Sequence, residues 1–300
     1  QTTRRVNMKK ERNSKLGYAK NGWLYKEKTA GYIFSAPFIF GFLFFVIVPV
    51  ATSLYYAFCN YNILKPARWV GLKNFIDIFQ DPTFYKALGV TLKFAFISVP
   101  LKLVALILLK GTKLTPFYRA AYYLPSILGS SVAVAILWKR MFAVDGLVNK
   151  LLGIQFAWLG STTAALWVII LLAVWQFGSS MLIFLSAMKQ IPPELYEAAR
   201  VDGAGGIYSF FRITLPLLTP TIFFNLVMQL INGFMVFAQG QIITDGKPMN
   251  STLFYVLYMY QQSFEYSKVG YAAAMGWILL VLVALFTGLL FKTKKYWVYE

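Results

Sequence analysis

The sequence predicts an all-α polytopic membrane protein with about six transmembrane helices and a short, charged helix-turn-helix between two of them. Composition is the first observation: 58% of the 300 residues are hydrophobic and only 13% are charged, whereas soluble domains carry roughly 25% charged residues. The second is the recurrence of apolar runs of about 20 residues, the length that crosses a bilayer. The chain has no histidine and a single cysteine, Cys59. These counts exclude an internal disulfide and histidine-based metal or catalytic sites.

The N-terminal segment is strongly basic and precedes the first apolar run. Nine of the 29 Lys and Arg residues lie in the first 28 positions. A net charge of +18 would suit nucleic acid, but cations that flank apolar runs are typical of membrane proteins, so no nucleic-acid partner is expected. The apolar segment that follows, 30–58, is much longer than the roughly 7–15-residue core of a signal peptide. We therefore predict a basic cytoplasmic tail over 1–29, followed by a retained helix.

Six apolar runs predict the membrane spans. They lie near residues 30–58, 87–109, 120–142, 164–187, 216–238 and 269–291. Six spans place both termini on one side, and the charge of the loops decides which side. The segments on the side of the termini hold 18 Lys and Arg residues, and the opposite loops hold nine. We expect both termini in the cytoplasm, a membrane domain over 30–291 and a C-terminal cytoplasmic tail over 292–300.

Features within and between the spans predict a bundle rather than isolated anchors. Prolines interrupt three of the spans, and lipid tolerates them only where neighbouring helices or water satisfy the freed carbonyls; they are Pro37, Pro49, Pro100 and Pro125. In the outer loop 71–79, apolar residues recur at helical intervals, which predicts an amphipathic helix lying in the membrane interface. These residues are Leu72, Phe75, Ile76 and Phe79.

A charged, glycine-broken segment separates the fourth and fifth spans. Pro192-Pro193 and the acids Glu194 and Glu197 have the pattern of a helix start. Gly203, Gly205 and Gly206 end this helix, a second short helix is expected from about Ile207 to Ile213, and Leu215-Pro216 turns the chain back into lipid. We call 193–213 the elbow. Its rigid, polar shape suits mechanical contact with another protein, although a helix that merely re-enters the interface would have similar spacing.

The elbow carries a recognisable pattern. Glu197-Ala198-Ala199 is followed after three residues by Gly203 and after nine more by Ile213-Thr214-Leu215-Pro216. This pattern resembles the signature of the permease subunits of ATP-binding-cassette (ABC) importers at every position. The flanking residues 190–196 and 202–205 resemble the maltose-type carbohydrate permeases, the binding-protein-dependent inner-membrane components, and weaker similarity extends over residues 31–291.

The resemblance implies a function and a set of partners. In that family the elbow is a cytoplasmic coupling helix-turn-helix that docks onto an ATPase. By analogy, nine residues would carry the coupling: Leu195, Glu197, Ala198, Ala199, Arg200, Asp202, Gly203, Gly205 and Ile213. The implied partners are a second homologous permease, two cytoplasmic ATPases, an extracytoplasmic solute-binding protein and a carbohydrate. The implied location is the bacterial cytoplasmic membrane.

Two departures from the family pattern accompany the resemblance, and a phosphate-binding loop is missing. The second span looks about four residues shorter than is usual, and Lys247 stands where glycine is common. The nearest match to a phosphate-binding loop, from Gly240 to Gly246-Lys247, has five intervening residues and then Pro248, so it does not fit the required spacing. ATP and Mg²⁺ would therefore bind to the partner ATPase, and the chain is predicted to be a non-catalytic subunit without a cofactor or metal of its own.

Polar residues inside two spans are candidates for the substrate pathway. The fourth span offers Trp175, Gln176 and Ser180, and the fifth offers Asn225, Gln229 and Asn232 at helical spacing. The analogy with maltose-type permeases points to Gln176, Phe177, Ser180, Asn232 and Gly233 as the sugar contacts. The alternative is that these amides only hold helices together.

Two lysines lie inside the second span. Lys93 and Lys102 are nine positions apart, on nearly opposite faces of a helix. Both could extend toward the membrane interfaces. Alternatively, one of them could offset the charge of an anionic sugar such as a uronate oligosaccharide.

The sequence also bears on two other classes of function. A stand-alone secondary transporter or channel is the alternative to an ABC permease, but ion-coupled carriers usually bury a carboxylate in a span. Here all eleven Asp and Glu residues fall in predicted loops or tails. A membrane-embedded enzyme is disfavoured because no catalytic constellation is present.

Overall fold

The computed structural model describes residues 27–108, 123–124, 126 and 132–299. Residues 1–26 of the predicted tail, Pro125 and much of the third predicted span lie outside the described residues. The chain divides into two compact units, residues 1–56 and 57–300, which we call the N-terminal unit and the main unit.

The described part of the N-terminal unit is one long helix. It consists of α2 (Glu27–Phe42), a π-helical turn η2 (Leu43–Ile47) and most of α3 (Val48–Ala57). Gly31–Ala57 is long and apolar enough to cross a membrane, as the predicted first span requires. The π-helical turn directly precedes Pro49, whose ring would clash with the carbonyl four residues earlier in a regular α-helix. The helix therefore continues through Pro49, and Pro37 likewise lies inside α2 without ending it.

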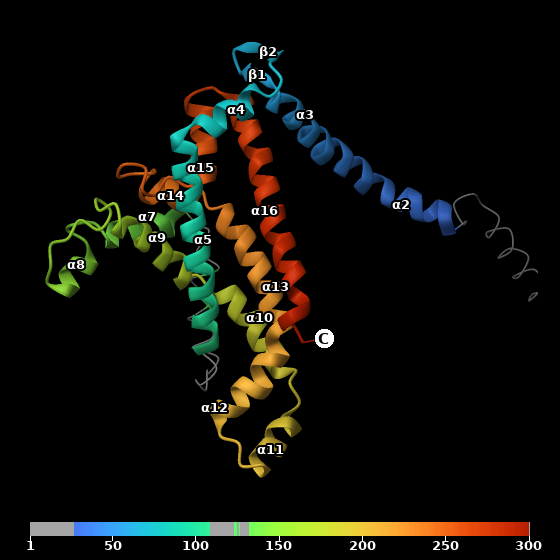
Figure 1. The fold of residues 1–300 in the computed structure, drawn as a ribbon, viewed down its shortest axis with the longest axis vertical. Coiled ribbons are helices and arrows are strands. Elements are labelled where there is room, and N and C mark those ends of the chain that lie inside the picture. Colours follow the sequence, from blue (N-terminus) through green and yellow to red (C-terminus); the bar gives the residue numbers. More distant parts are fainter. Residues whose placement is uncertain (1–26, 109–122, 125, 127–131, 300) are drawn as a thin grey trace, which may run out of the picture. The chain divides into compact units, whose positions relative to one another are not determined.

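Three long helices form the centre of the main unit (Figure 1). They are α5 (Pro82–Leu108), α13 (Leu215–Phe234) and α16 (Val269–Trp297). Helices α5 and α13 pack closely where a Cβ on Gly233 would lie 3.1 Å from the Cβ of Ala95. Over both units, the described residues include four helices that could each span a membrane, and a bent pair makes a fifth candidate. The all-α polytopic prediction is confirmed.

The fourth predicted span is not a single straight helix. It is the bent pair α9 (Ala164–Trp175) and α10 (Gly178–Lys189), with an angle of 41° between them. The break falls at Gln176 and Phe177, where Gln176 has ψ of 26°, outside the α-helical region. Apolar length alone does not reveal such a break, because neither proline nor charge interrupts the run between Ala164 and Met188.

The prediction that the chain turns at Leu215-Pro216 is wrong. The short helix α12 (Gly206–Ser209) runs through the π-helical turn η4 (Phe210–Thr214) directly into α13. Gly206–Phe234 is thus one helix of 29 residues. As at Pro49, a π-helical turn precedes the proline and makes room for its ring.

Other boundaries also differ from the predictions. Helix α5 begins at Pro82 rather than near 87, α13 ends at Phe234 rather than near 238, and α16 continues to Trp297 rather than 291. The early start of α5 gives the second span 27 helical residues, so the apparent shortness noted in the sequence does not lie at this end. Of the third predicted span, α7 (Val132–Met141) is described.

The sequence analysis missed a β-hairpin. Strands β1 (Cys59–Asn62) and β2 (Lys65–Trp69) pair in antiparallel fashion, with Cys59 opposite Trp69. Helix α4 (Lys73–Gln80) follows and confirms the helix expected in 71–79. Its buried residues are Asn74 and Ile78. The buried Asn74 amide donates to the backbone oxygens of Ala57 (2.8 Å) and Cys59 (2.9 Å), which anchors α4 to the start of the hairpin.

Shorter helices complete the main unit. They are α8 (Leu147–Leu152), α11 (Pro193–Val201), α14 (Ala238–Ile243) and α15 (Tyr255–Tyr260), the last followed by the π-helical turn η5 (Gln261–Glu265). The core between these helices and the long ones is aromatic. The rings of Phe94 and Phe254 meet edge to face at 5.2 Å, and both residues are buried.

Candidate functional site

The elbow is an exposed helix-turn-helix at one end of the main unit, and the hairpin lies at the other end (Figure 1). Its first helix, α11, starts at Pro193 with Glu194 in the first turn. Its end is stabilised by a Schellman arrangement: the Gly203 N–H bonds to the Arg200 carbonyl at 3.0 Å, and the Ala204 N–H to the Ala199 carbonyl at 2.8 Å. Gly203 has φ of +73°, a conformation that costs glycine little.

The predicted coupling residues divide into an outer and an inner group. Most are exposed: Leu195, Glu197, Ala198, Arg200, Asp202, Gly203 and Gly205. Ala199 is half-buried, and Ile213 packs against the buried cluster formed by Phe177, Met181, Phe184, Ile191 and Leu218. The Tyr196 and Thr214 hydroxyls are 2.8 Å apart. This bond ties α11 to the base of the 206–234 helix.

A polar cavity of about 540 Å³ lies within the main unit. Four of the predicted pathway residues line it: Gln176, Gln229, Asn232 and Gly233. The sequence analysis missed Ser179 and Gln239, which also line it. Gln239 was placed in an outer loop, and no periodicity in the sequence indicates that the short helix α14 brings it back toward Gln176.

Side-chain hydrogen bonds connect the helices around this cavity, which we call the central cavity. The Lys102 ammonium donates to Gln229 Oε1 at 2.9 Å, and Gln229 Nε2 donates to Ser180 Oγ at 2.8 Å. Gln239 Nε2 donates to Gln176 Oε1 at 2.9 Å. Lys102 therefore points into the bundle rather than toward a helix end.

The other predicted pathway residues do not line the central cavity. Trp175 stacks on Trp138, with ring centroids 5.5 Å apart. Phe177 belongs to the buried cluster beneath the elbow. Asn225 is buried and donates to the Thr221 carbonyl of its own helix at 3.0 Å, which favours the packing interpretation for this residue.

Lys93 is separated from Lys102 and is exposed. It lines a different pocket, together with Tyr85, Lys86 and Thr163. The structure thus brings only one of the two candidate counter-charges to the central cavity.

Long apolar helices around a polar cavity, with a charged elbow exposed at one end, define a multispanning membrane permease. The family described as "Binding-protein-dependent transport system inner membrane component" matches residues 28–292. The chain therefore belongs to this family. It is a non-catalytic, membrane-spanning permease subunit of an ABC transporter, and the resemblance seen in the sequence is confirmed.

Individual relatives and a solved structure agree with this assignment. The chain is 49% identical over 287 residues to the probable ABC transporter permease protein YesP of Bacillus subtilis (strain 168), covering 91% of this chain and 93% of YesP. It is 34% identical over 281 residues to the arabinooligosaccharides transport system permease protein AraP of the same organism, covering 88% of each. A chain in the crystal structure of a bacterial ABC transporter involved in the import of the acidic polysaccharide alginate is 23% identical, with a TM-score of 0.77 over 91% of this chain and 99% of that one. The last likeness shows a shared fold.

Proposed function

We propose that this permease imports a carbohydrate, specifically an oligosaccharide, through the central cavity. The observation that carries the proposal is the gathering of Gln176, Gln229, Asn232 and Gln239 around one cavity. Amides can both donate to and accept from sugar hydroxyls, and Phe237 adds an aromatic face. The similarity to an arabinooligosaccharide permease over 88% of the chain supports the same class of cargo.

The coupling residues named above are proposed to receive the closure of a cytoplasmic ATPase. Support comes from the helix 206–234, because its first residues form the second arm of the elbow while Gln229 and Asn232 near its other end line the central cavity. A helix of 29 residues is about 43 Å long. Displacement of the elbow would therefore move cavity residues as part of the same rod.

The complete importer is proposed to contain further chains. We infer a second homologous permease, two ATPases that bind ATP and Mg²⁺, and an extracytoplasmic solute-binding protein. The termini and the elbow would face the cytoplasm, as the distribution of Lys and Arg favours.

Lys102 is proposed to offset the charge of an acidic sugar. Among the described residues that line the central cavity, it is the single charged side chain. Its ammonium contacts the neutral Gln229, and no described carboxylate pairs with it. A uronate carboxylate in the cavity would supply the missing opposite charge in a region of low dielectric constant.

Uptake of matched sugars tests both the cargo class and the charge. In the assembled transporter, Lys102→Gln should reduce uptake of an acidic oligosaccharide such as trigalacturonate at least about tenfold, the size expected from losing a charge-assisted hydrogen bond, and should spare a neutral one such as arabinotriose. Lys93→Gln is the matched control, because Lys93 lies outside the central cavity. Equal effects of the two variants would refute the role of Lys102, and failure to take up any oligosaccharide would refute carbohydrate as cargo.

A further inference from the structure

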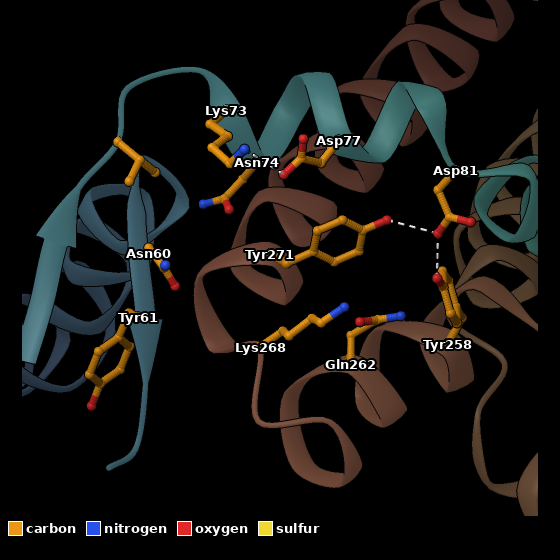
Figure 2. Close-up of a pocket in the computed structure, with 11 residues that line it drawn as sticks. Asn60, Tyr61, Lys73, Asn74, Asp77, Asp81, Tyr258, Gln262, Lys268 and Tyr271 are labelled. Atoms are coloured by element: carbon orange, nitrogen blue, oxygen red, sulfur yellow. Dashed lines mark hydrogen bonds and ion pairs between the residues drawn. The ribbon is translucent and has the colours of Figure 1, made fainter. Parts of the chain in front are cut away.

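A second polar pocket lies at the hairpin end of the main unit, away from the central cavity. It has a volume of about 480 Å³ and is lined by residues of β1, α4, α15, η5 and α16 (Figure 2). This volume is within the range of roughly 300–1,000 Å³ typical of small-molecule sites. None of the predicted site residues lines it. The predicted topology puts this outer pocket on the extracytoplasmic side.

One wall of the outer pocket is held rigidly by Asp81. Its Oδ2 accepts hydrogen bonds from the hydroxyls of Tyr258 and of Tyr271, the latter at 2.9 Å (Figure 2). Its Oδ1 accepts the Thr83 backbone N–H at 2.8 Å. With both oxygens engaged, Asp81 fixes the two phenols, and the Tyr271 oxygen can still accept a hydrogen bond from a ligand.

Two other side chains in the outer pocket leave a polar group without a described partner, although the Gln262 amide N–H group interacts with the Tyr258 hydroxyl. Gln262 is only 6% exposed, and no described donor lies within hydrogen-bonding distance of its Oε1. Lys268 extends into the pocket (Figure 2), and no ion pair involving it occurs among the described residues. Leaving a buried acceptor unsatisfied costs roughly 1–3 kcal/mol, so a ligand that donates to Gln262 Oε1 would be favoured.

The chemistry of these groups selects among ligand classes. A carboxylate would suit Lys268 but would repel Gln262 Oε1 and the Asp81 carboxylate. A cation would be repelled by Lys268, and the two carboxylates of the lining are engaged already, Asp77 with Lys73 and Asp81 in its three hydrogen bonds. A hydroxyl group both donates and accepts, so neighbouring hydroxyls on one sugar ring satisfy both groups.

We propose that the outer pocket is a second carbohydrate site, which binds an uncharged, hydroxyl-bearing face of a sugar ring. Gln262 Oε1 accepts from one ring hydroxyl, and the Lys268 ammonium donates to its neighbour. The proposal depends on the proposed function only for the choice of sugars as probes. It adds a site in which a sugar is held before or beside its passage through the central cavity.

Binding to the assembled transporter in nanodiscs tests this site. The probes are arabinotriose, maltotriose and xylotriose as neutral sugars and trigalacturonate as the anionic one, each titrated and followed by saturation-transfer NMR. Gln262→Met and Lys268→Met should each weaken binding of at least one neutral trisaccharide about fivefold or more. The matched controls are Gln80→Met and Lys65→Met, at exposed positions outside the pocket, and they should leave affinity unchanged.

The remaining outcomes separate this proposal from the proposed function. The outer site is refuted if no neutral trisaccharide responds to either pocket variant, or if trigalacturonate alone responds to Lys268→Met. It is also refuted if both variants weaken only the binding of the solute-binding protein, which would make the pocket a docking surface. Sensitivity confined to Lys102→Gln would remove the outer site while leaving import through the central cavity intact. Because Lys268 is exposed, its variant should fold even if Gln262→Met does not.

Discussion

At the scale of single residues, Asp81 joins three helices of the main unit although it is not among the predicted site residues. It caps the N-terminus of α5 through Thr83 and bonds to tyrosines of α15 and α16. Burial raises the pKa of Asp81, but the hydrogen bonds from Tyr258, the Thr83 backbone and Tyr271 outweigh it and hold the pKa below its usual value of 3.8. Burial and the bond to Asp81 raise the pKa of Tyr258 to about 12.

This lowered pKa predicts a loss of stability in acid. A carboxylate with a depressed folded-state pKa stabilises the fold fully above its unfolded-state pKa, and the contribution disappears as the pH falls through the folded-state pKa. The melting temperature of the detergent-solubilised protein should therefore fall below about pH 4, and Asp81→Asn should lower it at neutral pH and flatten this acid-induced decline. Asp77→Asn, which removes an exposed carboxylate from a pair at 4.0 Å, should keep the wild-type slope. Parallel curves for wild type and Asp81→Asn would contradict the prediction.

At the scale of elements, the end of α11 depends on one left-handed residue. Gly203 and Gly205 lie two positions apart, and a Cβ added to either would meet open space. They differ in backbone conformation, because Gly203 has φ of +73° and Gly205 has φ of −70°. Alanine at Gly203 should therefore cost roughly 1–2 kcal/mol of local stability, whereas alanine at Gly205 should cost little.

If the elbow couples to an ATPase, the cost at Gly203 should appear in transport. Gly203→Ala should reduce ATP-driven uptake by the assembled transporter several-fold, and Gly203→Pro should abolish it, without changing insertion into the membrane. Gly153→Ala is the matched control, because Gly153 has φ of +65° and open space around it but lies outside the elbow, and it should retain uptake. Membrane insertion would be followed by protease protection and uptake by a labelled oligosaccharide. Equal losses in the two alanine variants would show that the conformation of the elbow's turn is not what coupling requires.

The elements also show what the sequence could and could not predict. Span positions and the elbow follow from apolar length and from proline and glycine placement, which act locally. The start of α5 is earlier than predicted, because the charged Lys86 ends the apolar run, although Asp81-Pro82 is a capping residue followed by proline at the first helical position. The break at Gln176 and the hairpin could not be predicted from local sequence, since both involve contacts between distant residues. Gln239 bonds to Gln176 at the break, and Asn74 bonds to the backbone next to the hairpin.

The candidate sites follow the same division. Helical spacing correctly grouped Gln229 and Asn232, because both lie on one helix. It could not distinguish Asn225, which bonds within that helix, from its neighbours. The outer pocket was invisible in the sequence, since Asp81, Gln262 and Lys268 meet there from distant segments.

At the scale of the whole molecule, the chain is a non-catalytic permease subunit of an ABC transporter. It belongs to a family of permease subunits, and its sequence lacks a loop with the spacing that cradles phosphate. In the proposed function, the exposed elbow receives the movement of the ATPase, and the residues of the central cavity move in response. The continuous helix 206–234 lies between the elbow and the cavity.

This division of labour predicts that the chain is inert alone and that one charge on the elbow decides coupling. Reconstituted by itself into vesicles, it should move no labelled oligosaccharide, with or without ATP.

In the assembled transporter, Glu197→Lys should abolish ATP-driven uptake, because it reverses the charge of the exposed face of α11 while leaving its buried contacts in place. Asp145→Lys, which reverses an exposed acid paired with Arg140 outside the elbow, is the control and should transport normally, since such surface pairs contribute little to stability. Uptake by the chain alone would mean that the energy does not come from a partner, and normal uptake by Glu197→Lys would place the coupling contact elsewhere.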